Sequence, residues 1–155
     1  MPVEHVTGNL LAAPVDALVN TVNCAGVMGK GIALQFKQAW PAMFWDYTEA
    51  CRAGDVAPGR IHVWETRALL GPRYILNLPT KRHWRDASRL EDVEAGVVAL
   101  VETLHKLQIT SVAVPPLGCG NGGLDWAVVR PRIVELLALS TARILLYGPT
   151  EVRDV

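Results

Sequence analysis

The sequence predicts an α/β fold in which helices cover both faces of a β-sheet. Short apolar runs rich in β-branched residues alternate along the chain with longer segments whose apolar residues recur every three or four positions. The first pattern is typical of strands and the second of amphipathic helices. Their alternation is typical of sheets that bind ligands at the carboxyl ends of their strands. A functional site is therefore expected at those ends.

The expected strands are short runs of mainly apolar residues. They are residues 3–7, 16–22, 60–65, 73–78, 111–114 and 143–147. Runs of this kind suit a sheet that is buried on both faces.

The expected helices lie between these strands. The clearest carries one apolar stripe, formed by Leu90, Val93, Val97, Leu100, Val101, Leu104 and Leu107. Ser88 and Glu91 precede it with the spacing of a capping box. A second helical segment covers about residues 31–51, interrupted at Pro41, and a third covers about 126–139. The regular part of the third is expected to begin near Arg130, with Pro131 in its first turn.

Length and composition limit the classes of protein. The 155 residues, 50% of them hydrophobic, predict one domain over residues 1–155. Fifteen basic and fifteen acidic side chains cancel, so nucleic-acid binding requires a local basic patch. The three cysteines show no CxxC spacing and no apolar leader is evident, which favours a cytoplasmic location without disulfides. No apolar run reaches the ~20 residues of a membrane span, so no membrane partner is expected.

Glycine-rich loops follow two of the expected strands and each runs into a helix. The first covers residues 23–31 and the second residues 115–123. Glycines let backbone N–H groups approach a ligand, and a following helix N-terminus favours negative charge. Glycines in a single loop fit a plain tight turn about as well, but two such loops at neighbouring strand ends favour a diphosphate cradle.

The spacing of these loops excludes the usual phosphate motifs. Gly29-Lys30-Gly31 lacks the Ser or Thr that a P-loop uses on magnesium, and the first loop reads G-x-x-G-x-G, the reverse of the dinucleotide fingerprint. No HExxH, paired Cys/His or EF-hand spacing occurs, so no metal and no cofactor is expected. The ligand is predicted to be a phosphate-bearing nucleotide.

The chain resembles the macro domains, which bind ADP-ribose. The resemblance rests on the segments VTGNLL (6–11), VDALVNTVN (15–23), GVMGKGIALQF (26–36), PPLGCGNGGLDW (115–126) and ILLYGP (144–149). It implies a three-layer α/β/α sandwich around a mixed, mostly parallel sheet. NCAGVMGKGIALQFK and NLPTKRHWR (77–85) are most similar to the DarG-type antitoxin branch, whose members remove ADP-ribose from thymine in single-stranded DNA.

The resemblance implies roles for residues at the adenine end of the ligand. Gly8, Asn9 and Leu10 stand where macro domains hold the adenine, and Tyr147 would flank it. Many relatives have Asp in place of Asn9, where the carboxylate accepts a hydrogen bond from the adenine amino group. Asn9 can accept the same bond through its amide oxygen, without charge assistance. From the residue alone, Tyr147 fits a half-buried core tyrosine equally well.

The resemblance also implies that both glycine loops wrap the diphosphate and the distal ribose. The residues concerned are Thr21, Val27, Met28, Gly29, Gly31, Ile32 and Ala33 in the first segment, and Leu117, Gly118, Cys119, Gly120, Asn121, Gly122 and Gly123 in the second. Asn23 would face the distal ribose, where the bond to the modified base is cut. Lys30, inside the first loop, is expected to be solvated and to take no part.

Lys81 is the predicted catalytic residue, together with Asn23. It follows the expected strand 73–78 and Pro79, which direct it to the rim that holds the glycine loops. Alone it reads as a surface lysine, but the catalytic lysine of the DarG-type branch lies in this NLPTK motif. Lys81 would protonate or stabilise the leaving base, or attack the opened sugar as an amine. Protein-directed relatives place an aspartate where this chain has Gly122, while Asp125 reads as a helix N-cap.

Residues 81–89, KRHWRDASR, form a local basic and aromatic cluster in a neutral chain. The predicted DNA-binding residues are Arg82, His83, Trp84 and Arg85. Cations there can hold phosphates, and a tryptophan can stack on an unpaired base. The competing interpretation is a solvated loop with Trp84 packed over the core. The other tryptophans, Trp40, Trp45, Trp64 and Trp126, are expected in the core.

Three functions stay open at this level. The favoured one is a metal-independent DNA ADP-ribosyl glycohydrolase, acting as a monomer on ADP-ribosylated thymidine in single-stranded DNA. The resemblance implies a cognate DNA ADP-ribosyltransferase toxin as partner, contacted through a region outside this chain. The alternatives are a hydrolase of ADP-ribosyl esters on acidic protein residues and a reader that binds ADP-ribose without cleaving it.

Overall fold

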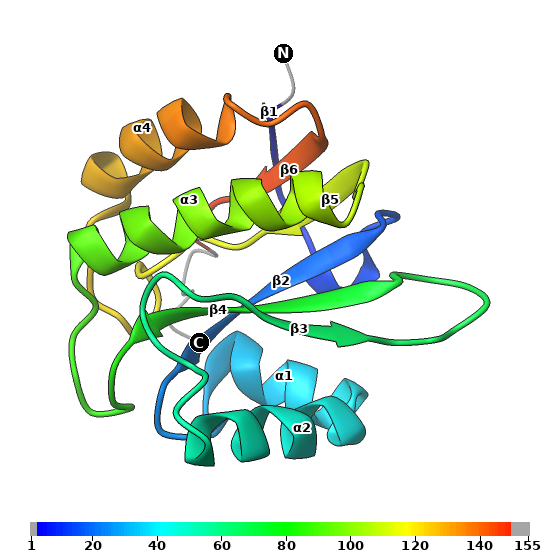
Figure 1. Ribbon diagram of the computed structural model, residues 1–155. Coiled ribbons are helices and arrows are strands. Elements are labelled where there is room, and N and C mark those ends of the chain that lie inside the picture. The colour runs from blue at the N-terminus through cyan, green and yellow to red at the C-terminus, as the bar shows by residue number, and fades with distance from the viewer. Residues whose placement is uncertain (1–2, 150–155) are drawn as a thin grey trace, which may run out of the picture.

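The computed structural model describes residues 3–149 and confirms a sheet between two layers of helices (Figure 1). The strands are β1 (Val3–Val6), β2 (Ala17–Asn23), β3 (His62–Glu65), β4 (Tyr74–Lys81), β5 (Ser111–Val114) and β6 (Arg143–Tyr147). The helices are α1 (Gly31–Ala39), α2 (Pro41–Arg52), α3 (Leu90–Lys106) and α4 (Trp126–Leu137), with a short 3-10 helix η1 at Leu10–Ala12.

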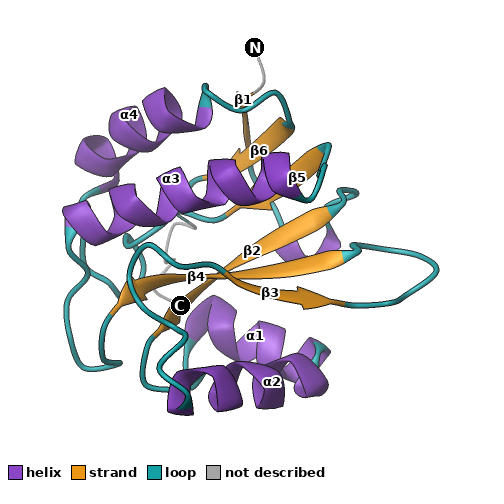
Figure 2. Cartoon of the chain, in the orientation of Figure 1, coloured by secondary structure: helices purple, strands orange, loops and turns teal. Residues whose placement is uncertain are grey.

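The sheet is mixed and mostly parallel, as the resemblance implied. The strand order is β1-β6-β5-β2-β4-β3. Only the β3–β4 pair is antiparallel among these neighbours. Helices α1 and α2 cover one face and α3 and α4 cover the other (Figure 2). Because β2 lies between β5 and β4, the loops after these three strands leave the sheet at one edge.

The core has two parts, one on each face of the sheet. In β2, Ala17 and Val19 belong to the part under α3 and α4, whereas Leu18 and Val22 belong to the part under α1 and α2. Successive side chains of a strand point to opposite faces, so a buried strand supplies both parts. This explains why β2 is buried at six of its seven positions and shows no alternation of buried and exposed residues.

The strand β4 is longer than predicted. It continues through Pro79 to Lys81, whereas the sequence predicted an end at residue 78. β3 pairs only with residues 74–77, so Pro79 lies beyond the antiparallel ladder, where its missing N–H breaks no β3–β4 bond. β5 and β6 have the predicted bounds, β1 and β3 differ from prediction by one or two residues at one end, and β2 is shifted by one residue at both ends.

Two helix starts differ from prediction. The break at Pro41 and the N-cap at Asp125, which accepts a bond from the Ala127 N–H, are confirmed. The capping box is wrong, because Arg89 occupies the N-cap of α3 and makes no side-chain cap bond. Pro131 lies inside α4 and not in its first turn, since the helix is already regular from Trp126.

The tryptophans are only partly in the core. Trp40, Trp64 and Trp126 pack against it, but Trp45 is 64% exposed, so the prediction for Trp45 is wrong. Helical spacing alone did not show which face of α2 is covered. Within residues 3–149, no helix is long and apolar enough to cross a membrane.

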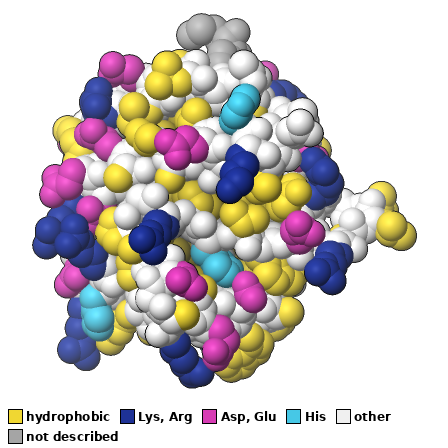
Figure 3. All heavy atoms as spheres, in the orientation of Figure 1, with side chains coloured by type: hydrophobic (Ala, Val, Ile, Leu, Met, Phe, Trp, Pro, Cys, Tyr) yellow, Lys and Arg dark blue, Asp and Glu magenta, His cyan; other side chains and the backbone are white. Residues whose placement is uncertain are grey.

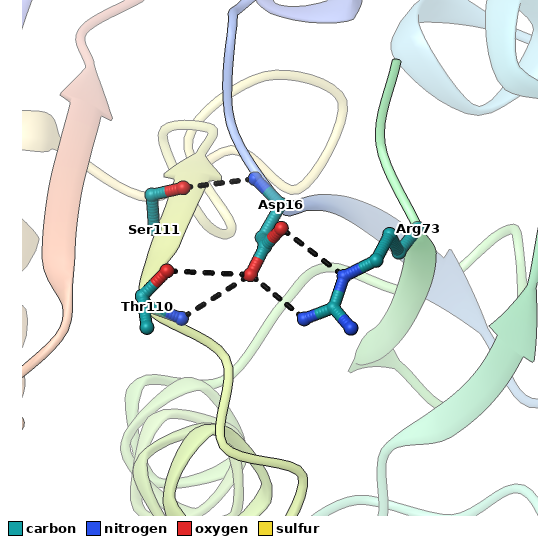
Figure 4. A network of polar contacts seen from close by, with 4 residues as sticks. All are labelled: Asp16, Arg73, Thr110 and Ser111. Atoms are coloured by element: carbon teal, nitrogen blue, oxygen red, sulfur yellow. Dashed lines mark hydrogen bonds and ion pairs between the residues drawn. The ribbon is translucent and has the colours of Figure 1, made fainter. Parts of the chain in front are cut away.

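A polar network centred on Asp16 joins the starts of β2, β4 and β5 (Figure 4). The Asp16 carboxylate accepts bonds from Arg73 Nε at 3.2 Å and Nη2 at 2.9 Å, and from Thr110 Oγ1 at 3.3 Å. The Asp16 N–H donates to Ser111 Oγ at 2.9 Å. The hydrogen bond from Arg73 holds the pKa of Asp16 below its usual value. Burial raises this pKa by less than Arg73 lowers it, and the bonds from Thr110 lower it further.

Substituting Asp16→Asn should lower the free energy of unfolding by about 1 kcal/mol at neutral pH, because the ion pair with Arg73 is partly solvated. A carboxyl whose pKa is lowered on folding stabilises the protein above its unfolded pKa of about 4 and loses this effect as pH falls through the folded value. Urea unfolding from pH 7 to pH 3 should therefore show the difference shrinking with acidity. Glu49→Gln, which breaks an exposed pair with Arg52, is the matched control and should have little effect. A difference that grows on acidification would contradict this assignment.

Candidate functional site

Asn23 and Lys81 lie side by side at the ends of two parallel strands. The register of β2 and β4 aligns Asn23 with Lys81 after a shift between Val22 and Asn23. The pairing continues past both strands, since the Cys24 N–H donates to the Arg82 carbonyl at 3.2 Å. The sheet thus brings together two predicted catalytic residues that are far apart in the sequence.

Lys81 has an unusual electrostatic environment for a lysine. Partial burial lowers its pKa, the positive charge of Lys30 lowers it further, and Asp86 opposes both effects. Lys30 is exposed, as expected, and its positive charge lowers the pKa of Lys81. A lysine in this setting is a better base or nucleophile near neutral pH than an ordinary one.

The side chain of Asn23 is bound into its own loop. Its Oδ1 accepts bonds from the Ala25 N–H at 3.0 Å, the Val27 N–H at 3.3 Å and the Tyr47 hydroxyl at 3.0 Å. Its Nδ2 donates to the Val27 carbonyl at 2.8 Å. The amide therefore shapes the β2–α1 loop and keeps one N–H for a ligand.

The two glycine loops meet. A Cβ added at Gly31 would come within 3.1 Å of Asn121 Nδ2, and the positive φ of Gly31, 55°, favours glycine. Val27 is exposed, whereas Met28 and Leu117 are 1% and 0% exposed. Only the main chain of Met28 and Leu117 can face a ligand. Thr21, Ile32 and Ala33 are half-buried.

The glycines of the second loop serve two purposes. A Cβ at Gly118 would lie 2.8 Å from Leu124 Cδ1, and a Cβ at Gly122 would collide with Ser88 Oγ. The Gly122 carbonyl also accepts a bond from the Ser88 N–H at 3.0 Å. A Cβ at Gly120 or Gly123 would have no neighbour within 4 Å, so a ligand can approach these two glycines. Packing therefore requires glycine at positions 118 and 122, whereas there is open space next to Gly120 and Gly123.

Cys119, in the same loop, is not poised as a nucleophile. Burial raises the pKa of its thiol to about 11, and its Sγ donates to the Leu117 carbonyl at 3.5 Å. The thiolate needed for attack is scarce at neutral pH.

The predicted adenine end lies at the paired ends of β1 and β6, where Val6 aligns with Tyr147. Asn9 caps η1, and its Oδ1 accepts a bond from the Leu11 N–H at 3.1 Å. The oxygen proposed to receive the adenine amino group is already engaged once, and a second lone pair is left. Tyr147 is 8% exposed and belongs to the core, which favours its structural interpretation over stacking.

The basic loop after Lys81 contains a stack of three side chains on the rim of the site. The rings of His83 and Trp84 lie 5.2 Å apart, and the Arg85 guanidinium lies 4.5 Å from the Trp84 ring centre. Trp84 is 43% exposed, which argues against the interpretation that it packs over the core. Arg82 instead makes two bonds to the nearly buried Asp92, at 3.2 and 3.3 Å, which anchor the loop to α3. On the face of the molecule seen in Figure 3, acidic and basic side chains are interspersed.

Comparisons with known proteins decide the family. The sequence profile of the macro domain matches residues 19–133. The chain belongs to the macro domain family. It is 54% identical over 149 residues to a DNA ADP-ribosyl glycohydrolase of Thermus aquaticus and 50% identical to one of Mycobacterium tuberculosis, each match covering 96% of this chain. The chain spans 41% and 42% of the lengths of these relatives.

Solved structures agree with this family. The macrodomain of Mycobacterium tuberculosis DarG has a TM-score of 0.93 at 50% identity, with 96% of this chain and 98% of that one covered. Thermosipho africanus DarTG in complex with ADP-ribose has a TM-score of 0.92 at 31% identity, covering 99% of this chain and 43% of that one.

Several residues around this macro-domain site were missed by sequence reasoning. Tyr47 and Asp92 are buried partners of Asn23 and Arg82, and Ser88 packs under the second glycine loop. Helical spacing placed Tyr47 and Asp92 on helices, but nothing in the sequence indicated which distant residue each one contacts. Among residues 3–149, no cluster of three or more His, Cys, Asp or Glu side chains is arranged to hold a metal ion.

Substituting Lys30→Gln should raise the pKa of Lys81 towards its ordinary value, because a neighbouring positive charge is removed. Asp86→Asn should lower it further, because a stabilising negative charge is removed. An NMR titration of the Lys81 side chain measures both shifts, with Lys106→Gln at the far end of α3 as the control. Shifts of the same sign in the Lys30 and Asp86 variants would show that these charges do not set the pKa.

Proposed function

We propose that this macro domain hydrolyses the N-glycosidic bond between ADP-ribose and thymine in single-stranded DNA. The observation that carries the proposal is the alignment of Lys81, whose pKa is lowered, with Asn23 at the ends of β4 and β2, beside the first glycine loop. The glycine loops would hold the diphosphate and distal ribose, and the remaining N–H of Asn23 would orient the sugar. Lys81 would then act at the anomeric carbon or on the leaving base.

The proposed hydrolysis replaces the base on the sugar by a hydroxyl group. The bond between the anomeric carbon of the distal ribose and the thymine ring nitrogen breaks, water supplies the hydroxyl that bonds to this carbon, and a proton goes to the nitrogen. Such bonds break through a state with positive charge on the sugar, so the departing base must be stabilised. As an ammonium, Lys81 supplies the proton or the charge. As a neutral amine, it bonds to the anomeric carbon of the opened sugar while the bond from that carbon to thymine breaks and thymine takes a proton, and water later displaces the amine.

The relatives support DNA as the substrate class. Both glycohydrolases compared above are named for DNA, and the chain covers the part of the DarG proteins that is their macrodomain. A further relative, of Thermosipho africanus, is named as a fusion of a DNA ADP-ribosyl transferase with a DNA ADP-ribosyl glycohydrolase, which supports such a transferase as the functional partner. The exposed stack on Trp84 offers a face for an unpaired base next to Lys81.

The deciding experiment offers the protein ADP-ribosylated single-stranded DNA and an ADP-ribosylated acidic protein in parallel. Release of ADP-ribose from the DNA supports the proposal. Release from the protein alone indicates the ester hydrolase, and binding of free ADP-ribose without release from either indicates a reader.

Replacing Lys81→Ala should leave the affinity for free ADP-ribose within about threefold while turnover on modified DNA falls by about 100-fold or more, since the acid or amine is lost. Calorimetry with ADP-ribose and single-turnover release from an oligonucleotide measure the two effects. Lys106→Ala, at the end of α3, is the matched control. Turnover at the wild-type rate in the Lys81 variant would contradict the assignment. Borohydride trapping of a covalent adduct in the wild type would identify the amine route.

Replacing Trp84→Ala should weaken binding of ADP-ribosylated single-stranded DNA by about 1–3 kcal/mol, because one stacking platform is removed. The affinity for free ADP-ribose should not change. Trp45→Ala is the matched control, since Trp45 is also exposed but lies on the outer side of α2. Fluorescence anisotropy with a labelled oligonucleotide measures the affinities. Equal losses in both variants would place the DNA elsewhere.

A further inference from the structure

Tyr47 is a buried hydroxyl that the proposed chemistry does not use but that contacts the proposed site. It lies on α2, is 0% exposed, and packs in the core part beneath α1 and α2. Its hydroxyl donates to the main-chain carbonyl of Asn23 at 2.6 Å and lies 3.0 Å from Asn23 Oδ1. One phenol therefore holds both the backbone and the side chain of the same residue.

This contact lies where the pairing of β2 with β4 is irregular. The register of β2 against β4 shifts between Val22 and Asn23, and the chain bends away at Cys24. The ladder is locally disrupted at such an irregularity, and the bond from the Cys24 N–H to the Arg82 carbonyl resumes it beyond Asn23. Tyr47 adds a second restraint on Asn23, from α2.

The bond also selects one orientation of the Asn23 amide. The N–H groups of Ala25 and Val27 donate to Oδ1, and the Tyr47 hydroxyl shares its one proton between Oδ1 and the main-chain carbonyl of Asn23. A rotated amide would present its NH2 group to those donors, which is unfavourable. Burial raises the pKa of Tyr47 far above its usual value, so the phenol stays protonated and remains a donor.

We propose that Tyr47 is a positioning residue for the glycohydrolase reaction, which fixes Asn23 so that its free N–H aligns the distal ribose with Lys81. This role rests on the proposed function and adds a residue to which that function assigns no part. Tyr47 acts through Asn23 and touches no reacting atom. Losing its hydroxyl should therefore affect the rate of the chemical step more than the binding of ADP-ribose, most of whose contacts lie on the two glycine loops.

The test is Tyr47→Phe, which keeps the ring and removes only the hydroxyl. We expect kcat on ADP-ribosylated single-stranded DNA to fall by about tenfold or more, while the dissociation constant of ADP-ribose changes by less than about threefold. Tyr74→Phe is the matched control, because Tyr74 begins β4 at the opposite end from Lys81. Rescue of kcat by 4-aminophenylalanine at position 47, which restores an N–H donor, would further support positioning over packing.

A double-variant cycle separates action through Asn23 from a general loss of structure. If Tyr47 works through Asn23, Tyr47→Phe should reduce kcat by less than about twofold when Asn23→Ala is already present. A reduction of about tenfold in that background would overturn the inference, as would a kcat within about twofold of wild type for Tyr47→Phe alone.

Two further measurements keep the outcomes distinct. If Tyr47→Phe does not fold, NMR of the wild type decides, since a bonded and buried Tyr47 hydroxyl proton gives a slowly exchanging signal near Asn23, and absence of this signal overturns the inference. Turnover by the wild type in the same assay tests the proposed function separately. If the wild type shows no turnover, the proposed function and the role of Tyr47 are both contradicted. If the wild type turns over and Tyr47→Phe has the same rate, only the role of Tyr47 is contradicted.

Discussion

Asn23 and Lys81 meet because β2 and β4 run parallel and end at the same edge of the sheet. The pairing supplies hydrogen bonds along β4, and it also fixes the distance between two side chains from separate parts of the chain. Every other feature of the site is attached to this edge. The first glycine loop leaves β2, the basic loop leaves β4, and the second glycine loop leaves β5 on the other side of β2.

The loops at this edge are held to one another as well as to the strands. Ser88 joins the basic loop to the second glycine loop, Arg82 joins it to α3 through Asp92, and Asn121 lies against Gly31 of the first loop. Glycine at positions 118 and 122 is required by this packing before any ligand is considered. A loop built in this way is preorganised, which lowers the conformational entropy that a ligand would otherwise have to overcome.

The sequence was sufficient for the strands, the loops at their ends and the neighbourhood of Asn23 and Lys81, because local patterns and parallel pairing specify these. It was insufficient where a single long-range contact decides. The predicted strand ended before Pro79, yet Pro79 is aligned with Val22 of β2 and lies beyond the short β3. Ser88 had the spacing of a cap, yet its main chain bonds to Gly122. Arg82 was predicted to bind DNA, and nothing in the sequence indicated that it also pairs with Asp92.

The same charges that lower the pKa of Lys81 would respond to the ligand. Lys30 is the N-cap residue of α1, at the end of the first glycine loop, where the diphosphate of the proposed substrate would be held. A bound diphosphate opposes the effect of Lys30 on Lys81, because its negative charge stabilises the ammonium form. Closure of the site around the substrate acts in the other direction, since it removes water from a lysine that burial already makes less basic. The protonation state of Lys81 during the reaction therefore depends on the balance between diphosphate charge and desolvation. In the free protein, the pKa of Lys81 already lies below its ordinary value.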